Sequence, residues 1–249
     1  MKKPQIAPKR PIIQTEALVK AFGLLPVLRN ISIDIAHGQF VALLGPNGSG
    51  KSTLLSLLAG LSRPTAGRVI IGGWELPDEA IQIRHQIGMV SHKALLYENL
   101  TAYENLKFFS QLYNLPQDNL DDHIKSLLDK VGLSRRSNSL ARTFSRGMQQ
   151  RLSIARALLH NPQILLFDEP YTGLDQQAGT TLDELFAEAM SGGRTIIMAT
   201  HQLERAVNLA DRVIIISKGK VGYDSPTAGL TPSQLTTDYA DITGTITSR

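Results

Sequence analysis

The sequence predicts an α/β fold in which a core of strands and helices is joined to an antiparallel β region and interrupted by a helical lobe. Residues 12–35 alternate apolar and polar side chains, and an apolar run at 40–44 passes through a glycine-rich loop into an apolar helix. Residues 93–160 change to helical periodicity. Period two is typical of strands and a period near 3.6 is typical of helices. We therefore expect one domain over residues 12–224 with a helical subdomain at about 93–160.

The antiparallel β region comes first. Within residues 12–35, Gly23 and Pro26 mark a turn between two alternating segments, as expected for paired strands. Further strands are predicted at 68–71, closed by two glycines, and at 87–90.

The helical lobe is predicted from caps and apolar stripes. Thr101 and Glu104 have the spacing of a capping box, and Gly132 follows a second helix as its expected C-terminal cap. The apolar stripes consist of Leu106, Phe109, Leu112 and Tyr113 on the first helix and Leu120, Ile124, Leu127, Leu128 and Val131 on the second. A third helix is expected over residues 146–160, ending before Pro162.

The rest of the core is predicted as strands alternating with helices. Strands are expected at 164–167, 195–199 and 213–217, and helices at 176–190 and 202–209. Both ends of the chain are expected to be tails. Residues 1–11 are basic and flexible, and residues 225–249, rich in Thr and Ser, offer at most a weak amphipathic turn.

The composition narrows the classes of function. The 249 residues include no cysteine, which excludes disulfides and thiolate metal sites. Lys and Arg number 26 against 22 Asp and Glu, an excess too small to favour nucleic acid as a direct partner. The apolar runs are strand-sized and the N-terminus lacks an apolar signal segment, so we expect neither a membrane span nor a signal peptide in this chain.

A glycine-rich loop organises the core. It consists of Gly45, Pro46, Asn47, Gly48, Ser49, Gly50, Lys51 and Ser52, followed by Thr53. It fits the Walker A pattern between a strand and a helix. Backbone N–H groups of such a loop surround phosphate oxygens, Lys51 supplies a cation for the β- and γ-phosphates, and Ser52 can ligate Mg²⁺. The sequence therefore predicts a nucleoside triphosphate site.

A second acidic element completes the hydrolytic chemistry. The strand at 164–167 is followed by Asp168 and Glu169, the arrangement of a Walker B element. Asp168 is expected in the Mg²⁺ shell, and Glu169 can polarise the water that attacks the γ-phosphate.

The stretch from Phe144 to Arg151, Phe-Ser-Arg-Gly-Met-Gln-Gln-Arg, resembles the L-S-G-G-Q signature of the ABC (ATP-binding cassette) ATPases. The resemblance covers roughly residues 12–222 and implies a P-loop NTPase core of the RecA-like kind. It also implies that Ser145 and Gly147 hold the γ-phosphate of ATP bound to a second cassette, packed head to tail. Arg146 and Met148 depart from the signature, whereas the phosphate-facing Ser and second Gly are kept.

The resemblance assigns further residues. Asp175 matches the D-loop, which communicates across the dimer. His201 matches the switch histidine that contacts the γ-phosphate and orders the attacking water, and Phe22 matches the aromatic that stacks on adenine. One position departs: the family usually has Gln where this chain has His92. An imidazole can hydrogen-bond or ligate a metal but lacks the paired groups of an amide, so we expect His92 to keep the coupling role with altered Mg²⁺ contact.

These expectations add up to an ATPase that powers a transporter. The resemblance implies a head-to-tail homodimer bound to a separate, multi-spanning membrane permease at the cytoplasmic face of the cell membrane. Docking is expected near residues 92–99 and the helical lobe.

The cargo is left open by the sequence. Residues 91–106 and 143–151 are similar to the haem-exporter ATPases of cytochrome c maturation. Export of drugs, lipids or polysaccharides is the main alternative. A further alternative is a soluble ABC ATPase acting on ribosomes or DNA.

Overall fold

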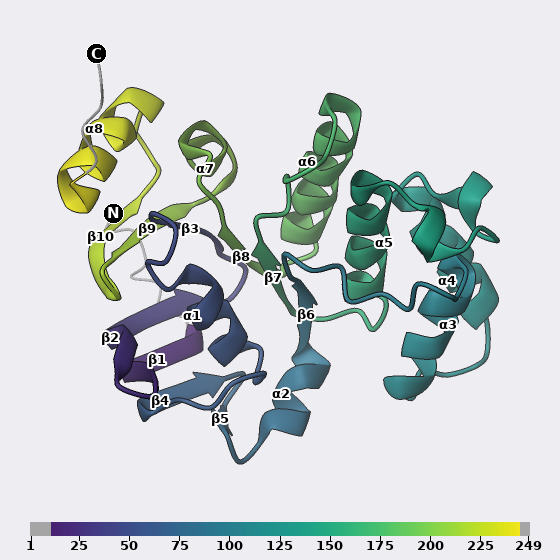
Figure 1. Cartoon of the computed structure of the whole chain (residues 1–249), viewed down its shortest axis with the longest axis horizontal. Helices are drawn as coiled ribbons and strands as arrows, with labels where there is room; N and C mark the ends of the chain where they lie inside the picture. The colour runs from purple at the N-terminus through teal and green to yellow at the C-terminus, as the bar shows by residue number, and fades with distance from the viewer. Residues whose placement is uncertain (1–10, 245–249) are drawn as a thin grey trace, which may run out of the picture.

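Two β-sheets with helices between and around them form the molecule (Figure 1). The computed structural model describes residues 11–244. The predicted basic tail at 1–11 lies outside the described residues except for Pro11, which begins the first strand. None of the helices described between 11 and 244 has both the length and the apolar character needed to cross a membrane.

The first sheet is the predicted antiparallel β region. It has the order β2-β1-β4-β5, with β1 at Pro11–Phe22, β2 at Leu25–Ala36, β4 at Ala66–Ile71 and β5 at Trp74–Leu76. On β2, Ile31, Ile33 and Ile35 are buried while the residues between them are exposed. This alternation matches a sheet with one face on a core and the other in water.

The second sheet carries the site and has the order β10-β9-β3-β8-β7-β6. Its strands are β3 (Phe40–Leu44), β6 (Ile87–Val90), β7 (Ile164–Asp168), β8 (Thr195–Ala199), β9 (Arg212–Ser217) and β10 (Lys220–Pro226). All neighbours are parallel except β10, which returns antiparallel beside β9. Parallel strands direct their carboxyl ends to one edge of the sheet, where ligand sites of α/β folds form.

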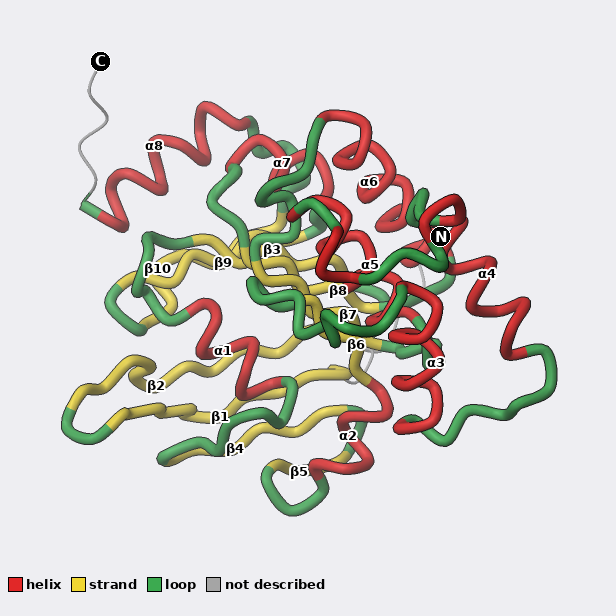
Figure 2. Tube along the Cα trace, turned by 45° about the vertical axis from the view of Figure 1, so that its right-hand side comes forward, coloured by secondary structure: helices red, strands yellow, loops and turns green. Residues whose placement is uncertain are grey.

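A core lies on each face of the second sheet. On β3, Val41 and Leu43 pack toward the first sheet, whereas Phe40, Ala42 and Leu44 pack toward the helical side. Helix α1, Lys51–Leu58, lies between the two sheets (Figure 2). Because both faces are covered, the central strands are apolar throughout, which is why β3 reads as a continuous apolar run.

Helices cover the other side of the second sheet. The lobe consists of α3 (Ala102–Leu112), α4 (Leu120–Lys130) and α5 (Arg146–Leu158), with two short 3₁₀ turns, η1 at Ser134–Arg136 and η2 at Ala141–Thr143, between α4 and α5. The capping box of Thr101 and Glu104 is present in both directions, and Gly132 follows α4 in the left-handed region at φ +66°. The remaining helices of the core are α2 (Ala80–Gln86), α6 (Gln176–Ser191) and α7 (Leu203–Leu209).

The C-terminal segment differs from the prediction of a tail. Residues Pro232–Thr243 form α8, a helix of 12 residues. Thr231 and Gln234 form a capping box and proline occupies the first turn, while Leu235 is fully buried. The expectation of a weak amphipathic turn was wrong because tertiary packing, which a weak apolar stripe does not reveal, stabilises most helices of this length.

Candidate nucleotide site

The Walker A loop connects β3 to α1 along a path that only glycine can follow at two points. Gly45 has φ +147°, and a Cβ there would lie 2.2 Å from the carbonyl oxygen of Ile216. Gly50 has φ +111°, and its Cβ would lie 2.5 Å from Leu28 Cδ2. The loop is therefore pressed between β9 and β2, with its amides and the first turn of α1 left to form an anion cradle.

Lys51 is held inside this loop. Its side chain is buried, and Nζ donates hydrogen bonds to the carbonyl oxygens of Gly45 at 2.7 Å and Pro46 at 3.2 Å. Burial lowers the pKa of Lys51, and the nearby charges of Glu169 and Asp168 partly oppose that shift. A cation fixed at the loop by carbonyl oxygens and faced by carboxylates is placed to meet phosphate oxygens.

Ser52 and Asp168 supply adjacent oxygens. Asp168 is the buried last residue of β7, and it accepts a hydrogen bond from Ser52 Oγ at 3.1 Å. A hydroxyl and a carboxylate are ligands that Mg²⁺ prefers, with phosphate oxygens completing the shell. Within residues 11–244 no three His, Cys, Asp or Glu side chains form a metal cluster by themselves. The residues therefore fit an ion brought in with a nucleotide.

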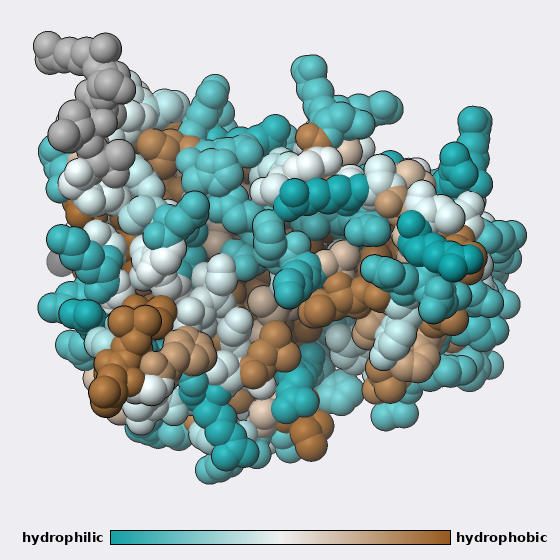
Figure 3. All heavy atoms as spheres, in the orientation of Figure 1, coloured by the Kyte–Doolittle hydropathy of each residue, from teal (hydrophilic) through white to brown (hydrophobic). Residues whose placement is uncertain are grey.

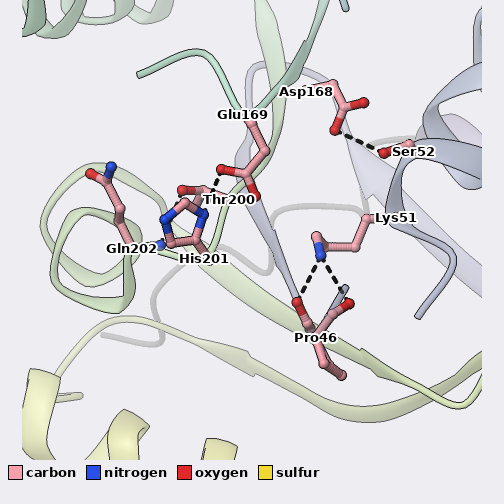
Figure 4. Close-up of polar contacts among 9 residues, drawn as sticks. Pro46, Lys51, Ser52, Asp168, Glu169, Thr200, His201 and Gln202 are labelled. Atoms are coloured by element: carbon pink, nitrogen blue, oxygen red, sulfur yellow. Dashed lines mark hydrogen bonds and ion pairs between the residues drawn. The ribbon is translucent and has the colours of Figure 1, made fainter. Parts of the chain in front are cut away.

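Glu169 and His201 form a directed pair. His201 Nδ1 lies 2.8 Å from Glu169 Oε2, and Figure 4 shows the two side chains facing each other with Lys51, Ser52 and Asp168 beside them. Glu169 adopts φ +53°, and its N–H donates to the carbonyl oxygen of Ala199 on β8 at 2.9 Å. A non-glycine residue held in the left-handed region is a strained conformation of the kind found at functional sites.

One cavity of 600 Å³ collects these groups. It is lined by Gly45, Pro46, Asn47, Ser52, His92, Asp168, Glu169, Thr172, His201 and Tyr239. His92 thus lies in the same cavity as the expected Mg²⁺ residues, and its predicted metal contact stays a prediction. Tyr239 was missed because α8 was missed, and the segment around it carries no motif.

The signature residues lie apart from this cavity. Ser145 is the exposed N-cap of α5 and accepts from the Met148 N–H at 3.3 Å, and neither it nor Gly147 lines the cavity. A Cβ at Gly147 would lie 3.0 Å from the Gly173 carbonyl oxygen, so the signature packs tightly on the segment before Asp175. The structure therefore leaves the amino end of α5 facing outward, away from its own Walker A loop.

Two further residues predicted for the site, Phe22 and Asp175, do not line this cavity. Phe22 is 56% exposed at the end of β1, with Lys20 Nζ 4.9 Å from its ring centroid, and it does not line the cavity. Asp175 is the N-cap of α6 and accepts from the Ala178 N–H at 2.8 Å. Adenine stacking by Phe22 and communication by Asp175 stay predictions.

Comparison with known proteins agrees with this geometry. A family model described as ABC transporter matches residues 28–172. The linearmycin resistance ATP-binding protein LnrL of Bacillus subtilis is 35% identical over 210 residues, which are 84% of this chain and 68% of that protein. Nod factor export ATP-binding protein I of Cupriavidus pinatubonensis is 34% identical over 233 residues, 94% of this chain and 72% of that protein.

Solved structures show the same fold. An ATP binding subunit of an ABC transporter has a TM-score of 0.85 at 30% identity, covering 93% of this chain and 99% of that chain. The dimeric post-hydrolysis state of the ATP-binding cassette MJ0796, bound to ADP and Pi, has a TM-score of 0.81 at 30% identity, covering 86% and 98%. The predicted fold and ATPase class are confirmed. This chain belongs to the ABC transporter family and is one of its ATP-hydrolysing, ATP-binding subunits.

Proposed function

We propose that this chain works as a head-to-tail pair whose ATP hydrolysis powers export through a separate membrane permease. The observation that carries the proposal is the separation of the two halves of the site. The Walker loop, Asp168 and Glu169 share one cavity, while Ser145 at the signature faces outward. A second chain can bring its own signature to the open cavity, and the related cassette MJ0796 is dimeric.

In this mechanism the chain's own residues bind the phosphates, keep the reacting groups in position and accept a proton from the attacking water. Loop amides and Lys51 hold the phosphates, and the Glu169 carboxylate accepts a proton from the attacking water. His201, hydrogen-bonded to Glu169 through Nδ1, keeps that carboxylate in position and presents its other nitrogen to the cavity. Ser52 and Asp168 would hold Mg²⁺, which would supply positive charge to the phosphates.

Mixing two inactive variants tests the pairing. Lys51→Ala removes the phosphate-binding cation, and Gly147→Asp puts a carboxylate where a phosphate is to bind. A head-to-tail heterodimer of the two would contain one intact site, so hydrolysis should reappear on mixing, at up to about a quarter of the wild-type rate for random pairing of independent sites. If each chain carried a complete site, the mixture would be as inactive as its parts.

An apolar groove on the surface supports the proposal of a membrane partner. It has a volume of 550 Å³ and lies between the end of α1, strand β6 and the lobe helices α3 and α5. Its lining includes Leu61, Leu95 and Tyr97, which are 62%, 58% and 49% exposed. Figure 3 shows apolar side chains gathered on the face along which the segment after β6 runs. Exposed apolar surface of this kind is typical of an interface, and it coincides with the docking region predicted near residues 92–99. We infer that a cytoplasmic helix of the permease occupies it.

Co-purification tests the membrane partner. Glu169→Gln keeps the carbonyl group and removes the proton acceptor, so this variant should retain the ATP-bound pair and its permease. We expect a multi-spanning membrane protein to be recovered from detergent-solubilised membranes with ATP present. Leu95→Glu in the same variant should lose that protein while still binding ATP. Recovery of ribosomal or DNA-repair proteins instead would contradict the transport proposal and favour the alternative of an ABC ATPase acting on those assemblies.

The identity of the exported molecule is a separate and more specific proposal. Export of haem rests on the similarity of residues 91–106 and 143–151 to haem-exporter subunits. The relatives reported above are named for other functions, linearmycin resistance and Nod factor export, and favour the alternative that drugs, lipids or polysaccharides are exported. Once the permease is identified, stimulation of ATP hydrolysis by haem or by lipid-like compounds in reconstituted vesicles decides between them.

A further inference from the structure

The C-terminal helix α8 reaches the nucleotide site. Figure 2 shows α8 beside α7 and over the β9–β10 hairpin, and Tyr239 on this helix lines the 600 Å³ cavity together with Pro46, Glu169 and His201. Every other lining residue comes from the Walker A loop, the first turn of α1, the last residue of β7, or the segments that follow β6, β7 and β8. Tyr239 is thus an additional wall of the site, supplied by the end of the chain.

The position of Tyr239 is fixed by packing on both sides of it. Leu235, one turn earlier, is fully buried, and the core also receives Leu230 and Ile242. A Cβ on Gly222 of β10 would lie 2.6 Å from Ile242 Cγ2, so glycine at this point permits α8 to approach the strand closely. Because the helix is anchored before and after Tyr239, packing holds the backbone of this residue beside the cavity.

The chemistry of Tyr239 suits a phosphate. Burial raises its pKa, and the negative charge of Glu169 raises it further, so the phenol stays a neutral O–H donor at physiological pH. Its hydroxyl has no hydrogen-bond partner within the described part of the chain, whereas its carbonyl oxygen accepts from Thr243 Oγ1 at 2.7 Å. Tyr239 lines the same cavity as Glu169 and His201, so its donor is available to a ligand held beside that pair.

We propose that Tyr239 is a nucleotide-binding residue whose hydroxyl donates a hydrogen bond at the terminal phosphate, so that α8 helps the site to distinguish ATP from ADP. The inference rests on the nucleotide site described above and adds to it a group from outside the recognised motifs. Its consequence is that affinity for the triphosphate, and not for nucleotides in general, depends on this helix.

Binding measurements separate the two nucleotides. The full-length chain and its Tyr239→Phe variant are titrated by calorimetry with the β,γ-imido analogue of ATP and, separately, with ADP, both with Mg²⁺. We expect Tyr239→Phe to lower the affinity for the analogue about tenfold, as for one lost hydrogen bond to a charged acceptor. The affinity for ADP should change less than twofold. Tyr223→Phe on β10 is the matched control, because Tyr223 does not line the cavity, and it should change neither.

The outcomes are distinct. Unchanged binding of both nucleotides by Tyr239→Phe, or equal weakening of both, would overturn the proposal. Equal thermal melting of Tyr239→Phe and wild type shows that the helix is still docked, and Leu235→Ala, which loosens α8, should reproduce the selective loss for the analogue. If wild type itself bound neither nucleotide, or Lys51→Ala bound both normally, the result would contradict the nucleotide site itself and not the role of Tyr239.

Discussion

At the scale of single residues, the Walker A loop contains two glycines with very different surroundings. Gly45 and Gly48 both have positive φ, but a Cβ on Gly45 would meet the Ile216 carbonyl oxygen at 2.2 Å while one on Gly48 meets nothing within 4 Å. We expect Gly45→Ala to lower the free energy of unfolding by at least about 3 kcal/mol, since strain and a backbone clash combine. Gly48→Ala should cost only about 1 kcal/mol. Denaturant unfolding measures both, and equal losses would contradict this account.

Where a motif fixes local geometry, the sequence was enough to predict which residues lie close together. Ser52, Asp168 and Glu169 line one cavity, and Lys51 is held at the Walker A loop beside it, because a strand followed by a glycine loop or an acidic pair determines where the side chains emerge. His201 was recognisable only through the family resemblance, since a single histidine after a strand has no local signature. Tyr239 could not be predicted, because its place in the site depends on how α8 packs.

At the scale of elements, Arg156 joins the helical lobe to β6 and to the segment after it. It is a buried residue of α5 that donates to the carbonyl oxygens of Ala94, Leu95 and Met89 at 3.1, 2.6 and 3.3 Å. Arg156→Lys should reduce the free energy of unfolding by about 2–4 kcal/mol, because one ammonium group cannot reach all three oxygens. Arg146→Lys on the same helix is exposed and should change it by less than about 0.5 kcal/mol. Chemical denaturation compares them, and similar losses would refute the role of Arg156.

A partly buried histidine just after α5 makes stability depend on pH. His160 stacks on Tyr113 with ring centroids 3.9 Å apart, and its Nε2–H donates to the Ile87 carbonyl oxygen at 3.0 Å. Burial lowers the pKa of His160 to about 4 from 6.5. The unfolded chain therefore binds a proton near pH 6.5 that the folded chain refuses until about pH 4. Its contribution is complete above pH 6.5 and falls by about 2–3 kcal/mol as the pH drops to 4.

Comparison with a variant isolates this effect from other titrating groups. In His160→Gln the free energy of unfolding should fall less steeply than in wild type between pH 6.5 and pH 4. Parallel pH profiles of the two proteins would show that His160 is not the cause.

Elements with strong local signals were predicted from the sequence. The capping box at Thr101 and the glycine after α4 are both present, since caps act within one helical turn. Helix α8 was missed, although Thr231, Pro232 and Gln234 form a start signal. Few apolar residues follow that signal. The helix is stabilised by its contacts with β9, β10 and α7, and the local sequence pattern does not reveal those contacts.

At the scale of the whole molecule, the central sheet interleaves segments that are far apart in sequence. Strand β8 lies between β3 and β7, and Ser52 contacts Asp168 across 116 positions. The sequence predicted the strands but not their order, because apolar runs buried on both faces carry no information on which neighbour each one takes. The same holds for the pairing of two such molecules. The outward-facing signature residues indicate that a partner binds there, but they carry no information on its affinity.

Association should depend on bound ATP. Glu169→Gln retains the phosphate-binding groups and loses the proton acceptor, so with ATP it should elute as a dimer and with ADP as a monomer. Light scattering during gel filtration measures the mass directly. Adding Ser145→Arg should keep the variant monomeric with ATP, while Ser134→Arg, on the surface of the lobe, should leave the dimer intact. A monomer under every condition would contradict the pairing.

The order of the central strands also has a consequence for how the protein is made. Strand β3 is complete at residue 44, yet its two partners in the sheet end at residues 199 and 217. At about 5–20 residues per second, on the order of ten seconds or more of synthesis passes before the Walker A strand can pair. The antiparallel sheet, complete by residue 76, can form during that interval and cover one side of the waiting apolar strand. A newly made chain thus gains its nucleotide site only after β8 and β9 have been synthesised.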